Sequence, residues 1–447
     1  MKTGHLVPAL SLLLLASNGA EAQKQWTLQQ CIDYALEHNI SLEQKRLSGW
    51  QSMEDEKQSR AALFPSISFN TNQNVSYRPY AQQTITLESG TMTTNSNTTT
   101  YNGSYGINAN WTVWNGNKNN LTVKRNKLAV ESAELEVAQQ ANTIQEQIAQ
   151  LYVQILYENE AVRVNEEIVK ASQLQVDRAR TMVEVGSLAV VDQKQLEAQV
   201  AQDEYSLAQA KSQLANYKLK LKQLLELHDD EPFDIIVPSV DDSKILTPLP
   251  DQTSVYNAAL ESRPEIKAGK IDVKSADIAV KSARSGYSPT ISLTAGIGTS
   301  NSSGSDQSFG KQVKTNLSNS IGLTLSMPIF DNLTTRTNIR KAKLAQISSE
   351  LQLKDTEKKL YSTVEDYYLN ATNSQQQYVY AKKNEESMKE SYGLVSEQFS
   401  LGLKNIVELT TGKNNLLQAQ QQLLQTKYTA LLNIAMLRFY EGETIKL

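Results

Sequence analysis

Two parts of the chain repeat apolar residues at the alternating three- and four-residue spacing of a coiled coil. In the first part this spacing runs from Ala141 to Val183 and resumes from Leu196 to Leu224. Residues 117–231 contain no proline and a single glycine, Gly186. We therefore predict long helices over about residues 117–185, 189–227, 333–401 and 405–440. At 1.5 Å per residue the first would be roughly 100 Å long, which suits a device that spans a distance.

Four shorter stretches alternate apolar and polar residues with a period of two. This pattern predicts strands with one apolar and one polar face, over about residues 66–80, 103–114, 288–300 and 317–329. The segments between the members of each pair, 88–104 and 299–310, are rich in Asn, Ser, Thr and Gly. We expect these two segments to be surface loops.

Such strands fit either a small soluble sheet or an outer-membrane barrel. Aromatic residues at the strand ends favour the barrel, where they would lie at the membrane interface. These residues are Tyr77, Tyr80, Trp111, Trp114 and Phe330. Since known barrels need about eight strands or more, four strands require several chains, and three chains would supply twelve.

The chain is a tandem duplication. The matching segments are 35–42 with 259–266, at an offset of 224 residues, and 114–116 with 330–332 and Gly186 with Gly402, both at an offset of 216. We therefore expect a first repeat over 23–228, an acidic, proline-rich linker over 229–251, and a second repeat over 252–447. The linker mixes short apolar runs with prolines, which suggests an ordered surface strap.

The first 22 residues have the order of a secretory signal peptide. Lys2 precedes an apolar stretch over 6–16, and Ala-Glu-Ala at 20–22 is a cleavage signal. We expect export and a mature chain that begins near Gln23. The apolar stretch is too short to span a bilayer, and no run of 18 apolar residues follows it.

Composition argues against several functional classes. The formal net charge of −4 does not suit a nucleic-acid surface, which would be basic. The single cysteine, Cys31, excludes an internal disulfide and reads as a small buried hydrophobe. His38 and His228 are isolated, and the sequence offers no phosphate loop, metal-ligand cluster or Ser/His/Asp arrangement. We expect no enzyme activity, no cofactor and no metal.

Taken together, these parts resemble the outer-membrane efflux proteins, the TolC-like channels. The resemblance rests on the duplicated unit, on ALEHNISL and SRPEI near the start of each copy, and on the turns VGSLAVVD and LGLKNIVEL. It implies an α+β membrane protein of two tandem repeats, each a β-hairpin plus long coiled-coil helices. A homotrimer would form a 12-stranded outer-membrane β-barrel on a periplasmic α-helical barrel. The implied partners are outer-membrane lipid, a periplasmic adaptor (a membrane fusion protein) and an inner-membrane pump of resistance-nodulation-division or ATP-binding cassette type.

The resemblance also assigns roles to the two glycine turns, which it places at the periplasmic tip. Glu408 and Thr411 match an acidic pair that narrows the aperture, although an acid is usual at the Thr411 position. Phe399 and Lys404 match a gate aromatic and a gate base, and Val191 and Asp192 match their contacts on the neighbouring coiled coil. The tips expected to touch the adaptor are Gly186, Ser187, Leu188, Gly402 and Leu403.

The residues alone allow a plainer account of these turns. Glycine ends a helix in the left-handed conformation without steric cost, and Asp192 and Glu408 would then lie in the first turn of the next helix, facing its dipole. For the whole chain, two other classes compete with the channel. One is a periplasmic coiled-coil interaction protein with a small soluble sheet, and the other is a periplasmic enzyme or solute-binding protein.

Overall fold

A computed structural model describes residues 25–87, 90–228, 233–238 and 241–447. The predicted signal peptide over 1–22 and its cleavage site lie outside these residues. The chain divides into two compact units. The helical unit comprises the chain up to Ile40, Asn142–Val255 and Val364–Leu447, and the sheet unit comprises Ser41–Ala141 and Tyr256–Thr363.

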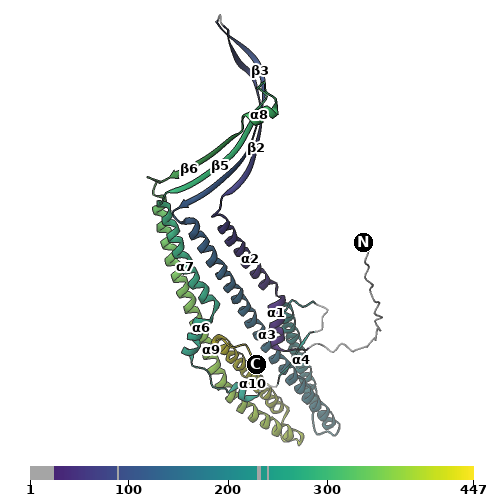
Figure 1. The fold of residues 1–447 in the computed structure, drawn as a ribbon. Coiled ribbons are helices and arrows are strands. Elements are labelled where there is room, and N and C mark those ends of the chain that lie inside the picture. The colour runs from purple at the N-terminus through teal and green to yellow at the C-terminus, as the bar shows by residue number, and fades with distance from the viewer. Residues whose placement is uncertain (1–24, 88–89, 229–232, 239–240) are drawn as a thin grey trace, which may run out of the picture. The chain divides into compact units, whose positions relative to one another are not determined.

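The sheet unit holds one antiparallel sheet of four strands (Figure 1). The strands are β2 (Ser66–Leu87), β3 (Gly90–Asn115), β5 (Thr290–Ser302) and β6 (Ser318–Ser326), in the order β2-β3-β5-β6. They lie where the period-two pattern predicts them, but the first hairpin is longer. The expected loop over 88–104 is wrong from Gly90 onward, because the Thr- and Asn-rich segment pairs with β2. The second expected loop also differs, since β5 continues to Ser302 and a short helix, α8 (Phe309–Thr315), follows.

The register of the strands gives the sheet two chemically different faces. Phe69, Ile107 and Ile297 are cross-strand neighbours in one row. Toward the helices, the next rows of that face hold Ile67 and Ile321, then Trp111, Leu293 and Leu323, then Ile291 and Leu325. Many of these side chains are exposed, with Ile321 at 83% and Leu323 at 71%. An apolar face of this size exposed by one chain marks a surface that contacts lipid or protein.

The helices repeat the duplication seen in the sequence. Helices α3 (Lys118–Glu184) and α9 (Thr334–Ser400) have 67 residues each, and their first residues are 216 positions apart. The remaining pairs are α1 (Leu28–His38) with α6 (Gln252–Ser262), α2 (Ile40–Ala61) with α7 (Pro264–Arg284), and α4 (Val190–Leu224) with α10 (Ile406–Glu441). Both α3 and α9 pass from the sheet unit into the helical unit.

Each strand-to-helix junction is a turn with two consecutive left-handed residues. In the first copy these are Gly116 and Asn117, with φ of 67° and 68°, and in the second Asn332 and Leu333, with φ of 52° and 66°. Asn115 Oδ1 accepts a hydrogen bond from the backbone N–H of Asn119, at 3.2 Å. At the matching place Asp331 Oδ2 accepts from Thr335 N, at 2.7 Å. These acceptors satisfy free N–H groups at the helix starts, so α3 and α9 begin at equivalent positions.

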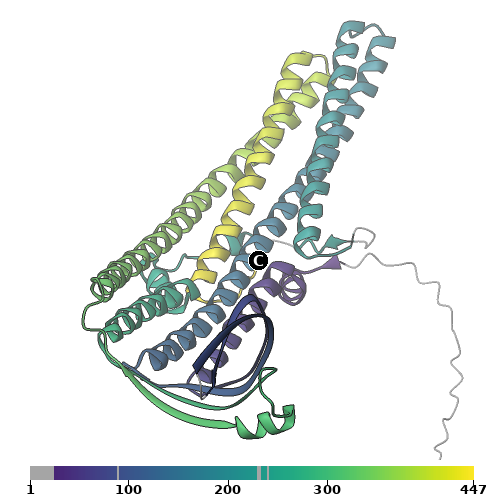
Figure 2. The ribbon, with the colours of Figure 1, turned by 90° about the horizontal axis from the view of Figure 1, so that it is seen from above.

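The helical unit carries two antiparallel helical hairpins, α3–α4 and α9–α10 (Figure 2). The described residues of the linker, 233–238 and 241–251, include a segment that is hydrogen-bonded to α9. Gln375 Nε2 donates to the carbonyl of Ile245 at 2.8 Å, at the end of α5 (Asp242–Ile245). Tyr378 Oη donates to Asp242 Oδ1 at 2.6 Å, and Lys382 pairs with the same carboxylate. A two-stranded parallel pair, β1 (Gln25–Trp26) with β4 (Asp234–Ile235), fixes another part of the linker.

The burial of Cys31 leads to a test of the helical unit. Its side chain is fully buried on α1, as the sequence predicts, and desolvation raises the pKa of its thiol to about 12. Because the thiolate is the reactive form, we expect Cys31 to resist a maleimide at pH 7 until the protein is unfolded. A cysteine placed at exposed Thr411 (T411C) is the control and should react at once. Rapid labelling of native Cys31 would contradict this packing.

Candidate functional site: the hairpin turns of the helical unit

The two turns that join the long helices have the same hydrogen bonds. Gly186 and Gly402 have φ of +75° and +74°, in the left-handed region. The N–H of each following residue returns to a carbonyl five positions back: Ser187 to Met182 at 2.8 Å and Leu403 to Gln398 at 2.9 Å. This is a Schellman end to a helix. A Cβ added at either glycine meets no atom within 4 Å, so conformation rather than space favours glycine here.

After each turn an acid occupies the third residue of the next helix. In α10, Glu408 forms a capping box: Glu408 N donates to Asn405 Oδ1 at 2.9 Å, and Asn405 N donates to Glu408 Oε2 at 3.2 Å. Lys404 Nζ lies 2.5 Å from Glu408 Oε1. The Lys404 ammonium, and then the Asn405 N–H, hold the pKa of Glu408 below its usual range. Asp192 holds the same first-turn position in α4, where the N-cap Ala189 makes no side-chain bond. Both acids therefore lie where the plainer interpretation places them.

Lys404, in the turn before α10, thus has a partner in the first turn of that helix. The predicted contact between Lys404 and Asp192 stays a prediction, with Glu408 as the competing partner of the lysine. Glu408 and Thr411 are three residues apart and so share one side of α10. Glu408 is half-buried and Thr411 is exposed.

Phe399 is buried among apolar side chains rather than exposed at the turn, with 2% of its surface accessible. It packs in a cluster at the ends of both hairpins, and Leu188 packs against the same cluster. The buried members are Val176, Ala179, Leu196, Val200, Phe399, Ile406 and Leu409. Burying a phenylalanine contributes about 1.5–3 kcal/mol, so Phe399 holds the two hairpins together near their turns. The role of gate aromatic remains a prediction.

Beyond this cluster the turns expose apolar side chains. Val191 is 66% exposed and Leu403 is 72% exposed. The other large exposed side chains at the turns are Val185, Val190, Leu401 and Val407. Gly186, Ser187 and Gly402 are exposed as well, and Leu188 is half-buried. We call this exposed set the tip surface. It is too apolar to be an ordinary solvated helix end, so it fits contact with another protein.

A buried ion pair crosses between the hairpins about two turns of α10 beyond the start of that helix. Lys413 Nζ lies 2.5 Å from Asp203 Oδ2, and their side chains are 4% and 6% exposed. Of the ion pairs between described residues, this is the one whose two side chains are both less than 10% exposed. Ser172 Oγ donates to Asp203 Oδ2 at 2.5 Å, and Gln199 Nε2 donates to Oδ1 at 2.9 Å. The pair therefore ties α3, α4 and α10 together.

Burial dominates the chemistry of this pair. Desolvation lowers the pKa of Lys413, although Asp203 opposes that shift. Beside the pair, Gln175 Nε2 donates to Ser396 Oγ on α9 at 2.8 Å. At the offset of 216 the other repeat has Ala419 and Glu197 in place of Asp203 and Lys413. The duplication therefore does not produce a second, equivalent ion pair between the repeats.

Neither member of this pair is among the site residues predicted from the sequence. Asp203 falls on the coiled-coil seam, where a charge needs a partner. Lys413 follows Gly412 on a helix rich in polar residues, where a lysine reads as solvated, and its partner lies 210 positions away. Only the packing of α4 against α10 shows that the two charges meet.

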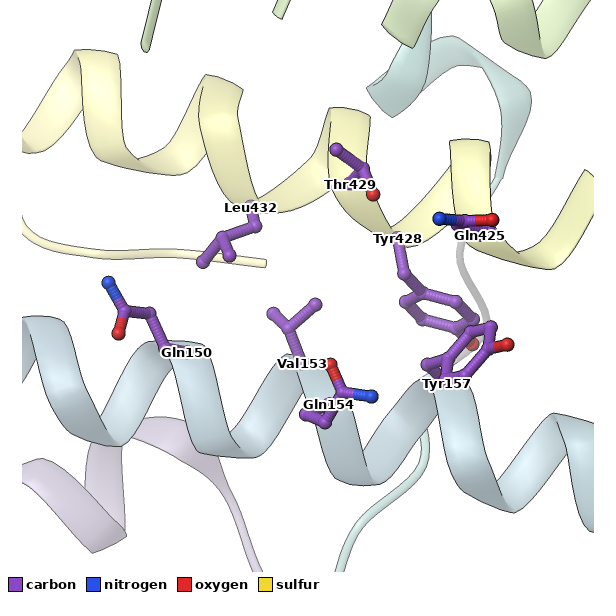
Figure 3. A pocket seen from close by; sticks show the side chains of 8 residues that line it. All are labelled: Gln150, Val153, Gln154, Tyr157, Gln425, Tyr428, Thr429 and Leu432. Carbon is purple, nitrogen blue, oxygen red and sulfur yellow. The ribbon is translucent and has the colours of Figure 1, made fainter. Parts of the chain in front are cut away.

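Figure 3 shows a groove of about 340 Å³ between α3 and α10. Its lining residues are Gln150, Val153, Gln154, Tyr157, Gln425, Tyr428, Thr429 and Leu432. Tyr157 and Tyr428 meet edge to face, with ring centroids 6.5 Å apart. Tyr428 Oη donates to Glu160 Oε1 at 2.9 Å. The groove brings together amides and phenols, which do not form a catalytic set.

Within residues 25–87, 90–228, 233–238 and 241–447, no helix is long and apolar enough to cross a membrane. The His, Cys, Asp and Glu side chains of these residues form no group of three or more that could hold a metal ion.

The buried ion pair can be tested by stability. Replacing Lys413 by Ala leaves the Asp203 carboxylate buried without its partner, which should cost about 3–5 kcal/mol and lower the thermal midpoint. The apolar double variant D203L/K413M removes both charges and should melt near or above the native temperature. K359A breaks an exposed pair with Asp355 and is the control, with no expected change. Circular dichroism of the detergent-solubilised protein measures all three, and a native midpoint for K413A would contradict the account.

Comparison with known proteins agrees with this architecture. The sequence model of the family described as Outer membrane efflux protein matches residues 31–226 and 255–443, one segment per repeat. TolC of Salmonella enteritidis is 22% identical over 336 residues, covering 74% of this chain and 66% of that protein. TolC of Escherichia coli K12 is 22% identical, covering 70% of this chain and 64% of that protein. The aligned region is thus just under two thirds of either TolC.

A solved structure of CusC superposes with a TM-score of 0.79 at 17% identity, covering 98% of both chains. The fold is therefore that of an outer-membrane efflux channel protomer, with a helical part and an antiparallel sheet. Because the family model covers most of both repeats, the identification does not depend on a single motif. The chain belongs to the outer membrane efflux protein family and is an outer-membrane protein that extends into the periplasm.

Proposed function

We propose that three copies of this chain form the outer-membrane channel of a tripartite efflux or secretion system. In this proposal the channel is a passive conduit from the periplasm and an inner-membrane pump to the outside. The observation that carries it is the pairing of an exposed apolar sheet face with long helices in one chain. A soluble periplasmic coiled-coil protein would have no use for that face.

The rows of the apolar face fit a membrane belt. On β5 they run from Ile291 to Ile297, six residues or roughly 20 Å along the strand. Aromatic side chains lie on both sides of these rows. Trp114 and Phe330 are at the helix end, 45% and 77% exposed. Tyr77 and Tyr80, 60% and 85% exposed, lie on β2 eight and eleven residues beyond Phe69, the residue that pairs into the farthest row. Trp111 pairs with Leu293 and so lies within the band, near its helix end. This arrangement supports an aromatic girdle above and below an apolar band.

The open sheet edges support a three-chain assembly. Strands β2 and β6 are the two edges of the four-stranded sheet. Unpaired edges invite pairing with another chain, and three such sheets would close a 12-stranded barrel. Outer-membrane lipid would then cover the apolar faces.

The tip surface supports docking to a periplasmic adaptor. Gly186, Ser187, Leu188, Gly402 and Leu403 would form the contact, because the small residues among them allow another helical hairpin to approach and exposed Leu403 can pack against it. Energy would come from an inner-membrane pump of resistance-nodulation-division or ATP-binding cassette type.

The aperture would be formed by the same turns. Three copies of Glu408 would give an acidic ring, which favours cations, with Thr411 one turn further along α10. Lys404, Phe399, Val191 and Asp192 would restrain the coils around it.

Efflux in cells tests the adaptor contact. In a strain that lacks its own channel, the native chain should restore efflux, and L403D should not, because a charge at the tip surface would be desolvated on docking. S305D adds the same charge to the exposed segment between β5 and α8, far from the turns in the sequence, and is the control that should still complement. L403D should form trimers in native amount. Loss of the trimer would instead assign Leu403 a structural role, and full efflux by L403D would remove the proposed contact.

Conductance tests the restraint at the aperture. If Lys404 links to Asp192 of the neighbouring coil, then K404A and D192N should each raise single-channel conductance in planar bilayers. If Lys404 acts only on Glu408, K404A should raise cation conductance and D192N should not. No change in either variant would contradict both roles.

A further inference from the structure

The four strands of the sheet carry one charged residue. Between them, β2, β3, β5 and β6 contain Arg78 and no other Asp, Glu, Lys or Arg. Charged residues make up 21% of the whole chain, so their near absence from the strands is a local property. No hydrogen bond or ion pair holds the Arg78 side chain among the described residues, and it is exposed.

Arg78 belongs to the polar face of the sheet. Residues of β2 alternate between faces, so Arg78 shares a face with Ser76, Asn74 and Asn70. Asn70 Nδ2 donates to Ser68 Oγ at 3.3 Å along this face. A Cβ added at Gly296 would meet Asn108 Oδ1 and Ser320 Oγ, which confirms that β3, β5 and β6 present the same polar side.

The polar face below Arg78 is a wall of hydroxyl and amide groups. Its members on the four strands are Ser66, Ser68, Asn70, Asn72, Asn74, Ser76, Asn102, Ser104, Asn108, Asn110, Thr112, Thr290, Ser292, Thr294, Ser300, Ser318, Ser320 and Thr324, with Gly106, Gly296, Gly298 and Gly322. Such groups donate and accept hydrogen bonds but carry no net charge. We call this surface the neutral wall.

Arg78 lies on the part of the β2–β3 hairpin that extends beyond β5 and β6, on the side remote from the helices: Arg78 pairs with Thr98, whereas β3 pairs with β5 only as far as Asn102. Strand β2 begins at Ser66, shortly after α2 ends at Ala61. Arg78 is twelve residues further, or roughly 40 Å at 3.4 Å per residue. Phe69 lies in the apolar row farthest from the helices, and Arg78 is nine residues, or roughly 30 Å, beyond it on β2.

We propose that Arg78 sets the charge preference of the channel exit. The inference rests on the proposed function, in which the polar faces of three sheets line one passage. Three copies of Arg78 then form a basic ring at the outer mouth, above a wall that does not discriminate by charge. The exit passes neutral and anionic solutes freely and retards cations. This preference is opposite to the cation preference expected of the acidic residues at the periplasmic turns.

Ionic strength determines where this preference is visible. The Debye length is about 30 Å at 0.01 M salt and about 3 Å at 1 M. A ring of three arginines therefore acts across a wide passage in dilute salt and only on ions in contact with it in concentrated salt. The K⁺ to Cl⁻ permeability ratio should depend on Arg78 at low salt and be nearly independent of it at 1 M.

The test is the reversal potential of the purified channel in planar bilayers under a KCl gradient around 0.01–0.05 M. R78Q should raise the K⁺ to Cl⁻ permeability ratio on the order of twofold, R78E should raise it further, and R78K should leave it unchanged. Two neighbours on opposite faces supply a matched pair. N74E adds an acid to the neutral wall and should raise the ratio, whereas Q73E adds the same acid to the outer face and should not.

The outcomes separate this inference from the channel proposal. A wild-type protein that forms no conducting pores would overturn the proposed function and the inference with it. Pores in which R78Q and R78E keep the native ratio would overturn only the role of Arg78. An equal shift in N74E and Q73E would overturn the assignment of faces.

Discussion

The equal length of the two long helices is the constraint on which the rest of the helical unit depends. Helices α3 and α9 are each 67 residues long, begin at matching left-handed junctions and end two residues before matching left-handed glycines. Their turns therefore fall together, and Phe399 can pack with Val176 and Leu196 in one apolar cluster. An insertion of one residue in either helix would rotate every later side chain by about 100° and expose that cluster.

Much of this arrangement could be predicted from the sequence because it depends on local rules. The heptad spacing gives the helices, glycine gives the turns, and the two offsets give the duplication. The acids at Asp192 and Glu408 follow from helix-start chemistry. Local rules fail where pairing between distant segments determines the secondary structure. The Thr- and Asn-rich segment from Gly90 looks like a loop until β2 supplies hydrogen-bonding partners along its length.

The details of the site depended on packing that no local pattern contains. Lys413 meets Asp203 only because α10 lies against α4. Phe399 matches a gate position in the family but is buried among apolar side chains, and Lys404 pairs with Glu408 within its own helix start. The left-handed conformation of Leu333 could not be predicted from the sequence either, because residues with bulky side chains seldom adopt it.

The chain has two surfaces with different proposed tasks. The sheet has an apolar face, which we propose contacts lipid, and a nearly uncharged polar face, while the turns have an apolar tip surface around acidic helix starts. The central claim is that copies of this chain enclose a passage through a membrane. Single-channel recording of the purified protein in a planar bilayer tests that claim most directly. The account predicts long-lived pores of uniform conductance, and a protein that leaves the bilayer insulating would contradict it.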